Sequence, residues 1–198
     1  MGNIAGIILA AGESRRMGTP KALLELGAET FLDRLIRVMG ESCSPVIVVL
    51  GHEAQRIRSG LSRLGTAIFV INQDYARGQL SSLQRGLAAV PSEAEGVLFT
   101  LVDRPLVQPS TIARILQRFE ERLPPELLVV PRVGLRHGHP VCMARELIAE
   151  FLALPPEAQA RDVIHRHAGE IAYVDVEDTG ILVDVNDPED YQRLVGRG

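Results

Sequence analysis

The stretch that decides the fold reads Ile4-Ala-Gly-Ile-Ile-Leu-Ala-Ala-Gly12-Glu-Ser-Arg-Arg-Met-Gly18-Thr-Pro-Lys21. Its first half, Ile4–Ala10, is apolar throughout, which is typical of a strand in a parallel sheet covered by helices on both faces. Its second half is a loop with two glycines and the cations Arg15, Arg16 and Lys21. Glycines let the backbone turn its N–H groups towards phosphate oxygens, so the sequence predicts a phosphate-binding loop after the first strand.

Two better-known phosphate-binding patterns do not fit this loop. Five residues separate Gly12 from Gly18, which excludes the G-x-G-x-x-G fingerprint, and a nicotinamide oxidoreductase is disfavoured with it. Lys21 follows Gly18 only after Thr19 and Pro20, and no Ser or Thr comes next, which excludes a Walker A loop. A plain surface loop with a few arginines is the alternative, but a buried strand, two glycines and three cations together favour a ligand site.

Beyond the loop, short apolar runs alternate with helical patterns. Strands are predicted at 46–50, 67–71, 97–102 and 127–131, and helices at 31–40, 53–64, 80–90 and 112–123. This alternation predicts an α/β fold, a Rossmann-like doubly wound and mostly parallel sheet. The rhythm then breaks: we expect a loop or hairpin at 133–140, helices at 145–153, 157–167 and 188–195, and strands at 171–176 and 181–185. No linker is evident, so residues 1–198 are predicted to form a single domain.

The composition excludes several classes of protein. The 198 residues carry a net charge of −4, which argues against a polybasic nucleic-acid binder. No apolar run approaches the ~20 residues that cross a bilayer, so no membrane partner is expected. Two cysteines, Cys43 and Cys142, are too few for a disulfide framework, and a reduced cytoplasmic protein is the simplest interpretation.

Two acidic segments are candidate metal sites. Asp103 follows the strand predicted at 97–102, and its carboxylate suits Mg²⁺ that carries nucleotide phosphates, although a turn residue is an equally good interpretation. Near the C-terminus, strand alternation would put Asp184 and Asn186 on one face of the chain. Asp187 precedes Pro188 and is expected to cap the last helix.

Two further loops carry polar groups. Ser81 and Ser82, with the free N–H groups of a helix start, could bind a base or a phosphate, although an ordinary helix start is the alternative. The segment 136–140 (Arg-His-Gly-His-Pro) is expected to be cationic and partly titratable. A histidine metal pair is discounted there because no third ligand has the usual spacing. His165 and His167 are interpreted as surface residues.

The glycine loop resembles the signature of the MobA-like NTP transferases, in the form Leu9-Ala-Ala-Gly-x-Ser-x-Arg-Met-Gly-x-Pro-Lys21. Its Ala-Ala-Gly form, followed by Pro-Lys-Ala-Leu-Leu, is similar to that of the molybdenum cofactor cytidylyltransferases. Guanylyl-transferring relatives tend to carry Gly where Ala11 stands. The resemblance continues in the family's order at 48–52, 72–82, 102–106, 136–140 and 184–190.

The resemblance implies a fold of the nucleotide-diphospho-sugar transferase type and a set of residue roles. Catalytic roles fall to Lys21, Arg15 and Asp103. Nucleotide binding falls to Leu9, Ala10, Ala11, Gly12, Arg16, Gly78, Ser81 and Ser82. Asp103 and Asn186 would hold Mg²⁺, with Asp184 the weaker candidate, and Arg136, Gly138 and His139 would face the acceptor. Two residues depart from the family's pattern: Arg104 replaces the usual Met or Gln, and Asn186 stands where Asp is common.

The function implied by this resemblance is nucleotidyl transfer. CMP would move from CTP to the phosphate of a molybdopterin-type acceptor with release of pyrophosphate, and a molybdoenzyme would be a partner that receives the product. Two alternatives remain. The first is the same chemistry on another phosphorylated acceptor, such as a sugar or polyol phosphate, and the second is a non-catalytic nucleotide- or cofactor-binding chaperone.

Overall fold

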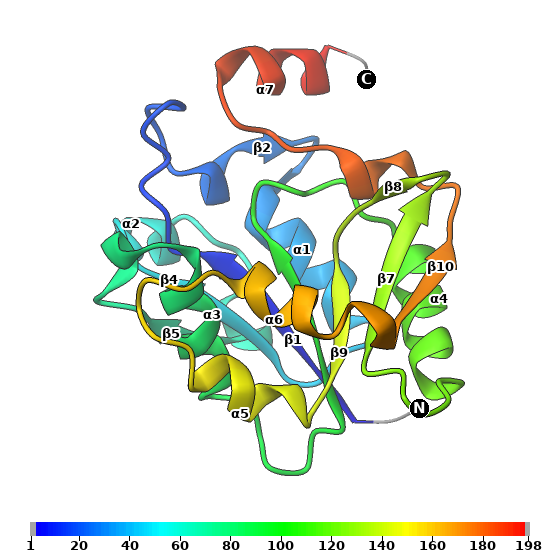
Figure 1. Ribbon diagram of the computed structural model, residues 1–198. Helices are drawn as coiled ribbons and strands as arrows, with labels where there is room; N and C mark the ends of the chain where they lie inside the picture. The colour runs from blue at the N-terminus through cyan, green and yellow to red at the C-terminus, as the bar shows by residue number, and fades with distance from the viewer. Residues whose placement is uncertain (1–2, 197–198) are drawn as a thin grey trace.

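One sheet of eight strands forms the centre of the molecule. The computed structural model describes residues 3–196, and the strand order is β10-β7-β9-β6-β1-β4-β5, with β8 paired to β7 (Figure 1). Neighbours run parallel except where β9 lies between β6 and β7 and at the β7–β8 hairpin, which confirms the mostly parallel sheet. The bounds are β1 (Ile4–Ala10), β4 (Val46–Leu50), β5 (Ile68–Ile71), β6 (Gly96–Leu101), β7 (Leu128–Val133), β8 (Arg136–His137), β9 (Val141–Ala144) and β10 (Ile171–Asp175).

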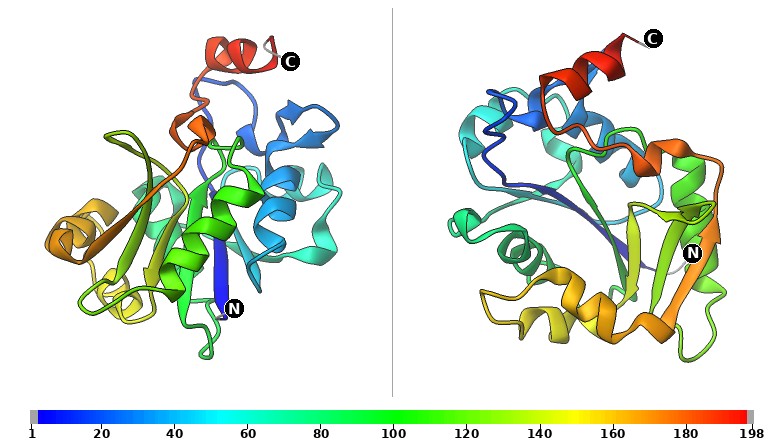
Figure 2. Two further views of the ribbon diagram at one scale, coloured as in Figure 1. Left: turned by 90° about the vertical axis from the view of Figure 1, so that its right-hand side faces the viewer. Right: turned by 45° about the horizontal axis from the view of Figure 1, so that its top comes forward.

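Helices cover both faces of the sheet (Figure 2). One face packs against α1 (Phe31–Gly40), α2 (Ala54–Ser59) and α4 (Pro109–Glu120), and the other against α3 (Gln79–Leu87), α5 (Leu147–Leu152) and α6 (Ala160–Arg166). Alternate side chains of β1 enter the two cores: Ile8 packs on the first side, and Ile7 and Leu9 pack on the second. This double burial explains why the strand is apolar at every position.

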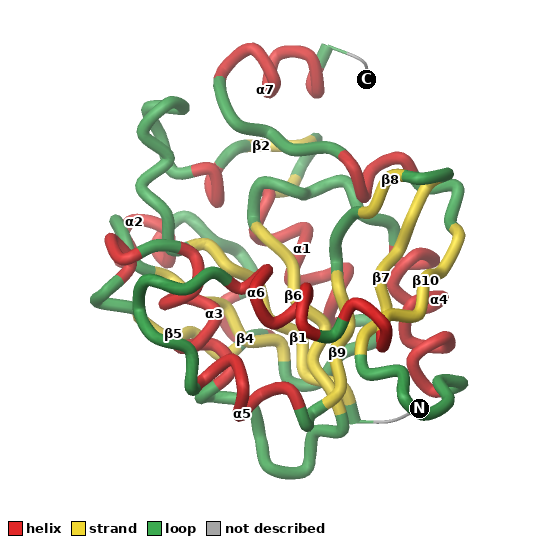
Figure 3. The backbone as a smooth tube through the Cα atoms, in the orientation of Figure 1, coloured by secondary structure: helices red, strands yellow, loops and turns green. Residues whose placement is uncertain are grey.

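The topology places a crevice at the carboxyl ends of β1 and β6. The chain leaves β1 and adds β4 and β5 on one side, then returns to add β6 on the other, which is the strand-order reversal where open α/β sheets bind ligands. Val102, just after β6, donates its N–H to the carbonyl of Leu9 at 3.0 Å, so the two strand ends meet. The glycine loop leaves β1 at this edge and runs to Pro20 without a helix (Figure 3).

Two sequence-based expectations about secondary structure were wrong, and one strand was missed. The segment 181–185 is not a strand: Thr179–Leu182 forms a 3₁₀ turn, because the Asp178 side chain accepts the N–H of Gly180 at 2.9 Å. A side chain on Gly180 would also lie 2.7 Å from a backbone oxygen of Leu106, so this segment crosses tightly over the end of the sheet. Helix α2 ends at Ser59 rather than at 64, and strand β9 was not anticipated.

The last helix, α7 (Pro188–Val195), begins as expected. The Asp187 side chain accepts the N–H of Asp190 at 3.0 Å, and Pro188 fills the first helical position. The helix lies near the small hairpin of β2 (Glu25–Leu26) and β3 (Glu29–Thr30), where the Tyr191 hydroxyl donates to a backbone oxygen of Glu25 (Figure 1). Among residues 3–196, no helix is long and apolar enough to cross a membrane.

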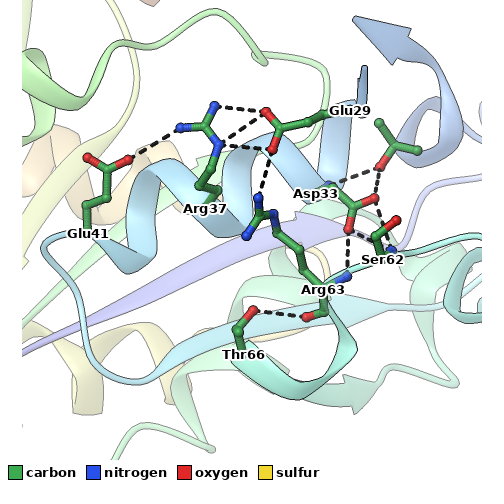
Figure 4. Close-up of polar contacts among 8 residues, drawn as sticks. Glu29, Asp33, Arg37, Glu41, Ser62, Arg63 and Thr66 are labelled. Atoms are coloured by element: carbon green, nitrogen blue, oxygen red, sulfur yellow. Dashed lines mark hydrogen bonds and ion pairs between the residues drawn. The ribbon is translucent and has the colours of Figure 1, made fainter. Parts of the chain in front are cut away.

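A buried carboxylate ties α1 to the loop after α2 (Figure 4). Asp33 is only 3% exposed, and it accepts hydrogen bonds from the Thr30 hydroxyl at 2.9 Å and from the backbone N–H groups of Ser62 and Arg63 at 3.0 and 2.9 Å. Thr30 in return caps α1 by accepting the N–H of Asp33. These bonds draw the chain away from the helical path, which explains why α2 is short.

We expect Asp33→Ala to lower the free energy of unfolding by about 2 kcal/mol, since two backbone donors and a hydroxyl lose a charged acceptor. Thermal unfolding of the purified variant measures this loss. Asp33→Asn keeps one oxygen acceptor and should lose less. Glu41→Ala, just after the last residue of the same helix, is the matched control, because its exposed pair with Arg37 contributes little stability. Equal melting temperatures for Asp33→Ala and Glu41→Ala would contradict the assignment.

Candidate active site

The glycine loop folds back so that Lys21 points over the ends of β1 and β6. Ser14 adopts a left-handed backbone (φ 51°), and its carbonyl accepts the N–H groups of Met17 and Gly18. The Ser14 hydroxyl oxygen accepts the backbone N–H of Lys21 at 3.1 Å, which fixes the return of the chain. Sequence reasoning did not single out Ser14, although a Ser at this position belongs to the quoted signature.

Three predicted residues meet around one ammonium group. Lys21 Nζ donates to Asp103 Oδ2 at 3.1 Å and to Asn186 Oδ1 at 3.5 Å. The backbone holds this group together, because the N–H of Val185 donates to the carbonyl of Asp103 at 3.0 Å. The Lys21 and Asp103 side chains are only 12% and 24% exposed, so their ion pair is partly shielded from solvent.

The oxygens around Lys21 fit a divalent cation. Asp103 Oδ1 is buried and has no hydrogen-bond partner among the described residues, a costly arrangement unless a ligand uses it. Asn186 adds an amide oxygen, and both residues already contact the same cationic group. Nowhere in residues 3–196 do three His, Cys, Asp or Glu side chains gather as a closed metal site. The donor set therefore suits a hard ion such as Mg²⁺ that takes its other ligands from phosphate and water.

A cleft of about 330 Å³ surrounds this group, and we call it the smaller cleft. A side chain built on Gly12 would meet nothing within 4 Å, so the loop backbone faces open space there. Gly78, at the start of α3, has φ 109°, a conformation that only glycine adopts readily. The predicted residues that line this cleft are Leu9, Ala10, Ala11, Gly12, Arg15, Arg16, Lys21, Gly78, Ser82, Asp103 and Asn186.

The two arginines of the loop lie at the open rim. The Arg15 side chain is 84% exposed and forms an ion pair with Glu13, and Arg16 is exposed as well. The hydrogen bond from Arg15 holds the pKa of Glu13 below its usual value. Exposed ion pairs contribute little stability, so Arg15 can leave the Glu13 carboxylate for a phosphate with only a small loss of free energy.

The two serines of α3 differ in place. Ser82 is buried at the cleft wall, and its hydroxyl oxygen accepts Asn72 Nδ2 at 3.0 Å. Ser81 instead lines a small separate hollow, and its hydroxyl donates to the carbonyl oxygen of Gly78 or Asp74. The structure thus brings Ser82 to the cleft, while Ser81 holds the loop before α3.

A larger cleft of about 960 Å³ adjoins the smaller one, and Gly78 and Gln79 line both. Of the predicted acceptor residues, Gly138 and His139 line the larger cleft, whereas Arg136 stays exposed on β8 outside its wall. The larger cleft is also lined by ionisable residues that we did not predict as site residues from the sequence. These are Arg77, Arg104, Glu157, Arg161, His137, His165 and Tyr173. The cationic side chains outnumber the single carboxylate, so this cleft suits an anionic ligand.

The segment 136–140 is less cationic than expected. Burial, with a smaller contribution from Arg104, lowers the pKa of His139 to about 4, so its ring is neutral at pH 7. The ring packs edge-on against Phe99. Gly138 is required for packing, because a side chain there would lie 2.3 Å from a backbone oxygen of Ile181.

Comparison with known proteins agrees with this geometry. Residues 6–171 match the model of the MobA-like NTP transferase domain. The chain belongs to the MobA-like NTP transferase family. It is 26% identical to the molybdenum cofactor cytidylyltransferase of Escherichia coli, over 96% of this chain and 95% of that one, and 27% identical to the molybdenum cofactor guanylyltransferase of Mesorhizobium japonicum, over 95% and 92%.

Solved structures show the same fold. Rv0371c from Mycobacterium tuberculosis, 28% identical, superposes with a TM-score of 0.84 over 98% of both chains. Its complex with manganese, 27% identical, gives 0.78 over 99% of this chain and 100% of that one. The family match and these relatives place the chain among the nucleotidyltransferases, whose fold is that of the nucleotide-diphospho-sugar transferases.

Arg104, where the resemblance leads us to expect Met or Gln, forms an ion pair with the second acidic segment. Its Nη2 lies 2.7 Å from Asp184 Oδ1. Burial raises the pKa of Asp184, and Arg104 opposes that effect. Because no strand forms at 184–186, Asp184 and Asn186 do not share a strand face, and Asp184 is paired with Arg104 while Asn186 contacts Lys21.

His167 is not the surface residue that the sequence suggested. Its Nε2 and Nδ1 lie 2.6 and 2.7 Å from carboxylate oxygens of Glu150 and Glu170, and these hydrogen bonds raise the pKa of the imidazole. The contact ties α6, a wall of the larger cleft, to α5. A raised pKa means that this stabilisation is complete below the histidine's ordinary pKa and is lost as the pH rises through the raised value.

Proposed function

We propose that this MobA-like protein transfers CMP from CTP to the phosphate of a molybdopterin-type acceptor. One observation carries the proposal: the glycine loop and the group of Lys21, Asp103 and Asn186 lie in a cleft that shares Gly78 and Gln79 with a larger, cationic one. The first cleft suits a triphosphate and the second an anionic acceptor. The volume of the larger cleft exceeds what a sugar or polyol phosphate needs, which favours the larger acceptor.

The reaction requires positioning more than proton transfer. An oxygen of the acceptor phosphate attacks the α-phosphorus of CTP, and the bond from that phosphorus to the bridging oxygen breaks, so that pyrophosphate leaves with the bonding electrons. A phosphate monoester has its second pKa near 6, so the attacking oxygen is already ionised at pH 7. The protein's task is to hold two polyanions together and to neutralise their charge.

The loop residues divide this work. The N–H groups around Gly12 face the phosphates, and Arg15 and Arg16 reach them from the rim. Lys21 exchanges Asp103 for phosphate oxygens when the nucleotide binds. Asp103 and Asn186 would hold Mg²⁺, which would supply positive charge to the reacting phosphates.

The choice of base rests on residues of the smaller cleft, since cytidylyl and guanylyl relatives are equally similar to this chain. The Ser82 hydroxyl oxygen accepts from Asn72, so its hydrogen is available to donate into the cleft. The pairing edge of cytosine offers two acceptor atoms, at N3 and O2, whereas that of guanine presents N–H donors at N1 and N2 and a single acceptor at O6. Ala11 is also bulkier than glycine and narrows the approach of a purine.

We expect Ser82→Ala to weaken CTP binding by about tenfold, the effect of removing one hydrogen bond, and to change GTP binding less. Isothermal titration with each nucleotide measures the ratio. Ser81→Ala is the matched control: it removes the neighbouring hydroxyl, which does not line the cleft, and should leave the ratio of the two affinities unchanged. An equal loss of CTP and GTP affinity in Ser82→Ala would contradict the base assignment.

The test of the whole proposal is a panel of nucleoside triphosphates with Mg²⁺, scored for pyrophosphate release. Each is assayed alone, with molybdenum cofactor, and with a set of sugar and polyol phosphates. We expect release with CTP and the molybdenum cofactor. Release with a sugar or polyol phosphate instead would replace the acceptor, and nucleotide binding without any release would favour the chaperone alternative.

A further inference from the structure

Arg104 stands at the junction of the two clefts. It follows Asp103 directly in the chain, and while Asp103 lines the smaller cleft, Arg104 lines the larger one. Its side chain is 17% exposed. A guanidinium group therefore lies next to the place where the nucleotide's phosphates are expected, on the side from which an acceptor would approach.

The hydrogen bonds of Arg104 leave part of the guanidinium unused. Nη1 donates to a backbone oxygen of Ile181 at 3.2 Å, and Nη2 contacts both carboxylate oxygens of Asp184, at 2.7 and 2.9 Å. Nε is buried and has no hydrogen-bond partner in the part of the chain that the structure describes. Asp184 thus contacts only one nitrogen of the guanidinium, Nη2. In a bidentate contact, Nε and Nη2 each donate to a separate oxygen, and here the Nε donor has no acceptor among the described residues.

The surroundings favour an anion in place of Asp184. Arg77 and Arg161 also line the larger cleft, against the single carboxylate of Glu157. Asp184 itself is partly exposed, with its side chain at 39%, so another anion can compete for the guanidinium. A phosphate monoester carries more charge than a carboxylate and has the oxygens for both Nε and Nη2.

We propose that Arg104 binds the acceptor's phosphate, and that Asp184 holds the guanidinium in the free protein until the phosphate replaces it. The inference rests on the proposed nucleotidyl transfer and adds the residue that positions the attacking oxygen. Because Arg104 neighbours Asp103 in the chain, a phosphate bound to it lies beside the phosphates of the nucleotide. The guanidinium of Arg104 is therefore paired with an anion in both states, with Asp184 in the free protein and with the phosphate in the complex.

The experiment measures binding of inorganic phosphate by isothermal titration, with and without α,β-methylene CTP and Mg²⁺. We expect Arg104→Met to weaken phosphate binding at least about tenfold, because the variant cannot form a bidentate charged pair. Asp184→Asn should strengthen phosphate binding, since the competing charge is gone. The matched control is Arg132→Met, which breaks an arginine–aspartate pair with Asp175 outside both clefts and should leave phosphate binding unchanged.

Three results would overturn the proposal: wild-type protein that binds no phosphate, Arg104→Met that binds it like wild type, or Asp184→Asn that weakens binding as Arg104→Met does. Weaker phosphate binding in Asp184→Asn is the result expected if the Arg104–Asp184 ion pair only stabilises the fold. Should Arg104→Met fail to fold, Arg104→Lys and the direction of the Asp184→Asn effect decide the question. The titration without nucleotide is independent of CTP binding, so failure of Arg104 and failure of the proposed function are distinguishable.

Discussion

Asp103→Ala is expected to lower kcat for pyrophosphate release by about 10²–10³-fold, as when a preorganised electrostatic contact is removed, while nucleotide affinity falls far less. The reason is the division of contacts in the smaller cleft. In the proposed reaction, the glycine loop and Lys21 face the nucleotide's outer phosphates, whereas Asp103, which has a buried oxygen without a hydrogen-bond partner among the described residues, would hold the cation. Turnover assays over a range of Mg²⁺ concentrations, with nucleotide titration on the same samples, measure the two effects separately.

Asp103→Asn should be nearly as inactive, because the amide has no negative charge and offers one oxygen where the carboxylate offers two. Once Lys21 has passed to the phosphates, the amide can turn its oxygen either way, but its NH₂ group still stands where a carboxylate oxygen was and cannot bind a metal ion. Size is conserved in this variant, so the loss reports on chemistry rather than on packing.

The control for Asp103 is Asn186→Asp, which introduces the carboxylate that the resemblance leads us to expect at this position and should retain or raise activity. The alternative interpretation makes Asp103 a turn residue whose loss costs stability. The turn itself is held by backbone bonds, from Val185 to the Asp103 carbonyl and from Arg104 to Leu101, so we expect the melting temperature to hold. A folded Asp103→Ala protein with wild-type kcat would exclude the metal-ligand role.

The elements that the sequence predicts well are those whose signal is local. Strands β1, β4 and β6 are apolar at almost every position because they are buried on both faces, and that pattern is visible without any knowledge of their partners. The glycine loop is equally local, since its spacing and charges lie within Gly12–Lys21. These features predict a nucleotide-type site at one edge of a parallel sheet, and the structure has a cleft there.

The features that escaped prediction depend on contacts distant in the sequence. Strand β9 has four residues and lies antiparallel between β6 and β7, an insertion that no local periodicity reveals. The Arg104–Asp184 pair joins positions 80 residues apart. His139 loses its charge because the fold buries it, which composition alone cannot indicate. The sequence therefore named residues that the structure brings together in one cleft, but it did not show how they pair in the free protein.

The other large effect is expected at Lys21, the one lysine in a chain with 21 lysines and arginines in total. Lys21→Ala should lower kcat/KM by about 10²–10³-fold, because it removes an ammonium group that is shielded from solvent and that stands on a backbone fixed by the hydrogen bond from the Lys21 N–H to the Ser14 hydroxyl oxygen. Lys21→Arg keeps the charge but replaces a compact ammonium with a planar fork, so we expect it to rescue little. Arg56→Ala, at an exposed ion pair outside the clefts, is the control for loss of one positive charge.

A lone lysine also allows a direct test of where the triphosphate binds. Reductive methylation of the chain modifies only Lys21 and the α-amino group, and the α-amino group serves as the internal reference. In the free protein, the Lys21 side chain is 12% exposed and paired with Asp103 and Asn186. When CTP and Mg²⁺ bind, the ammonium should pass from these oxygens to the phosphates and become covered by the nucleotide.

Methylation of Lys21 should then slow by about tenfold or more relative to the reference, the protection expected at a nucleotide concentration well above Kd. An unchanged ratio at a concentration where titration shows bound CTP would mean that the triphosphate lies elsewhere, and the low activity of Lys21→Ala would then need another cause.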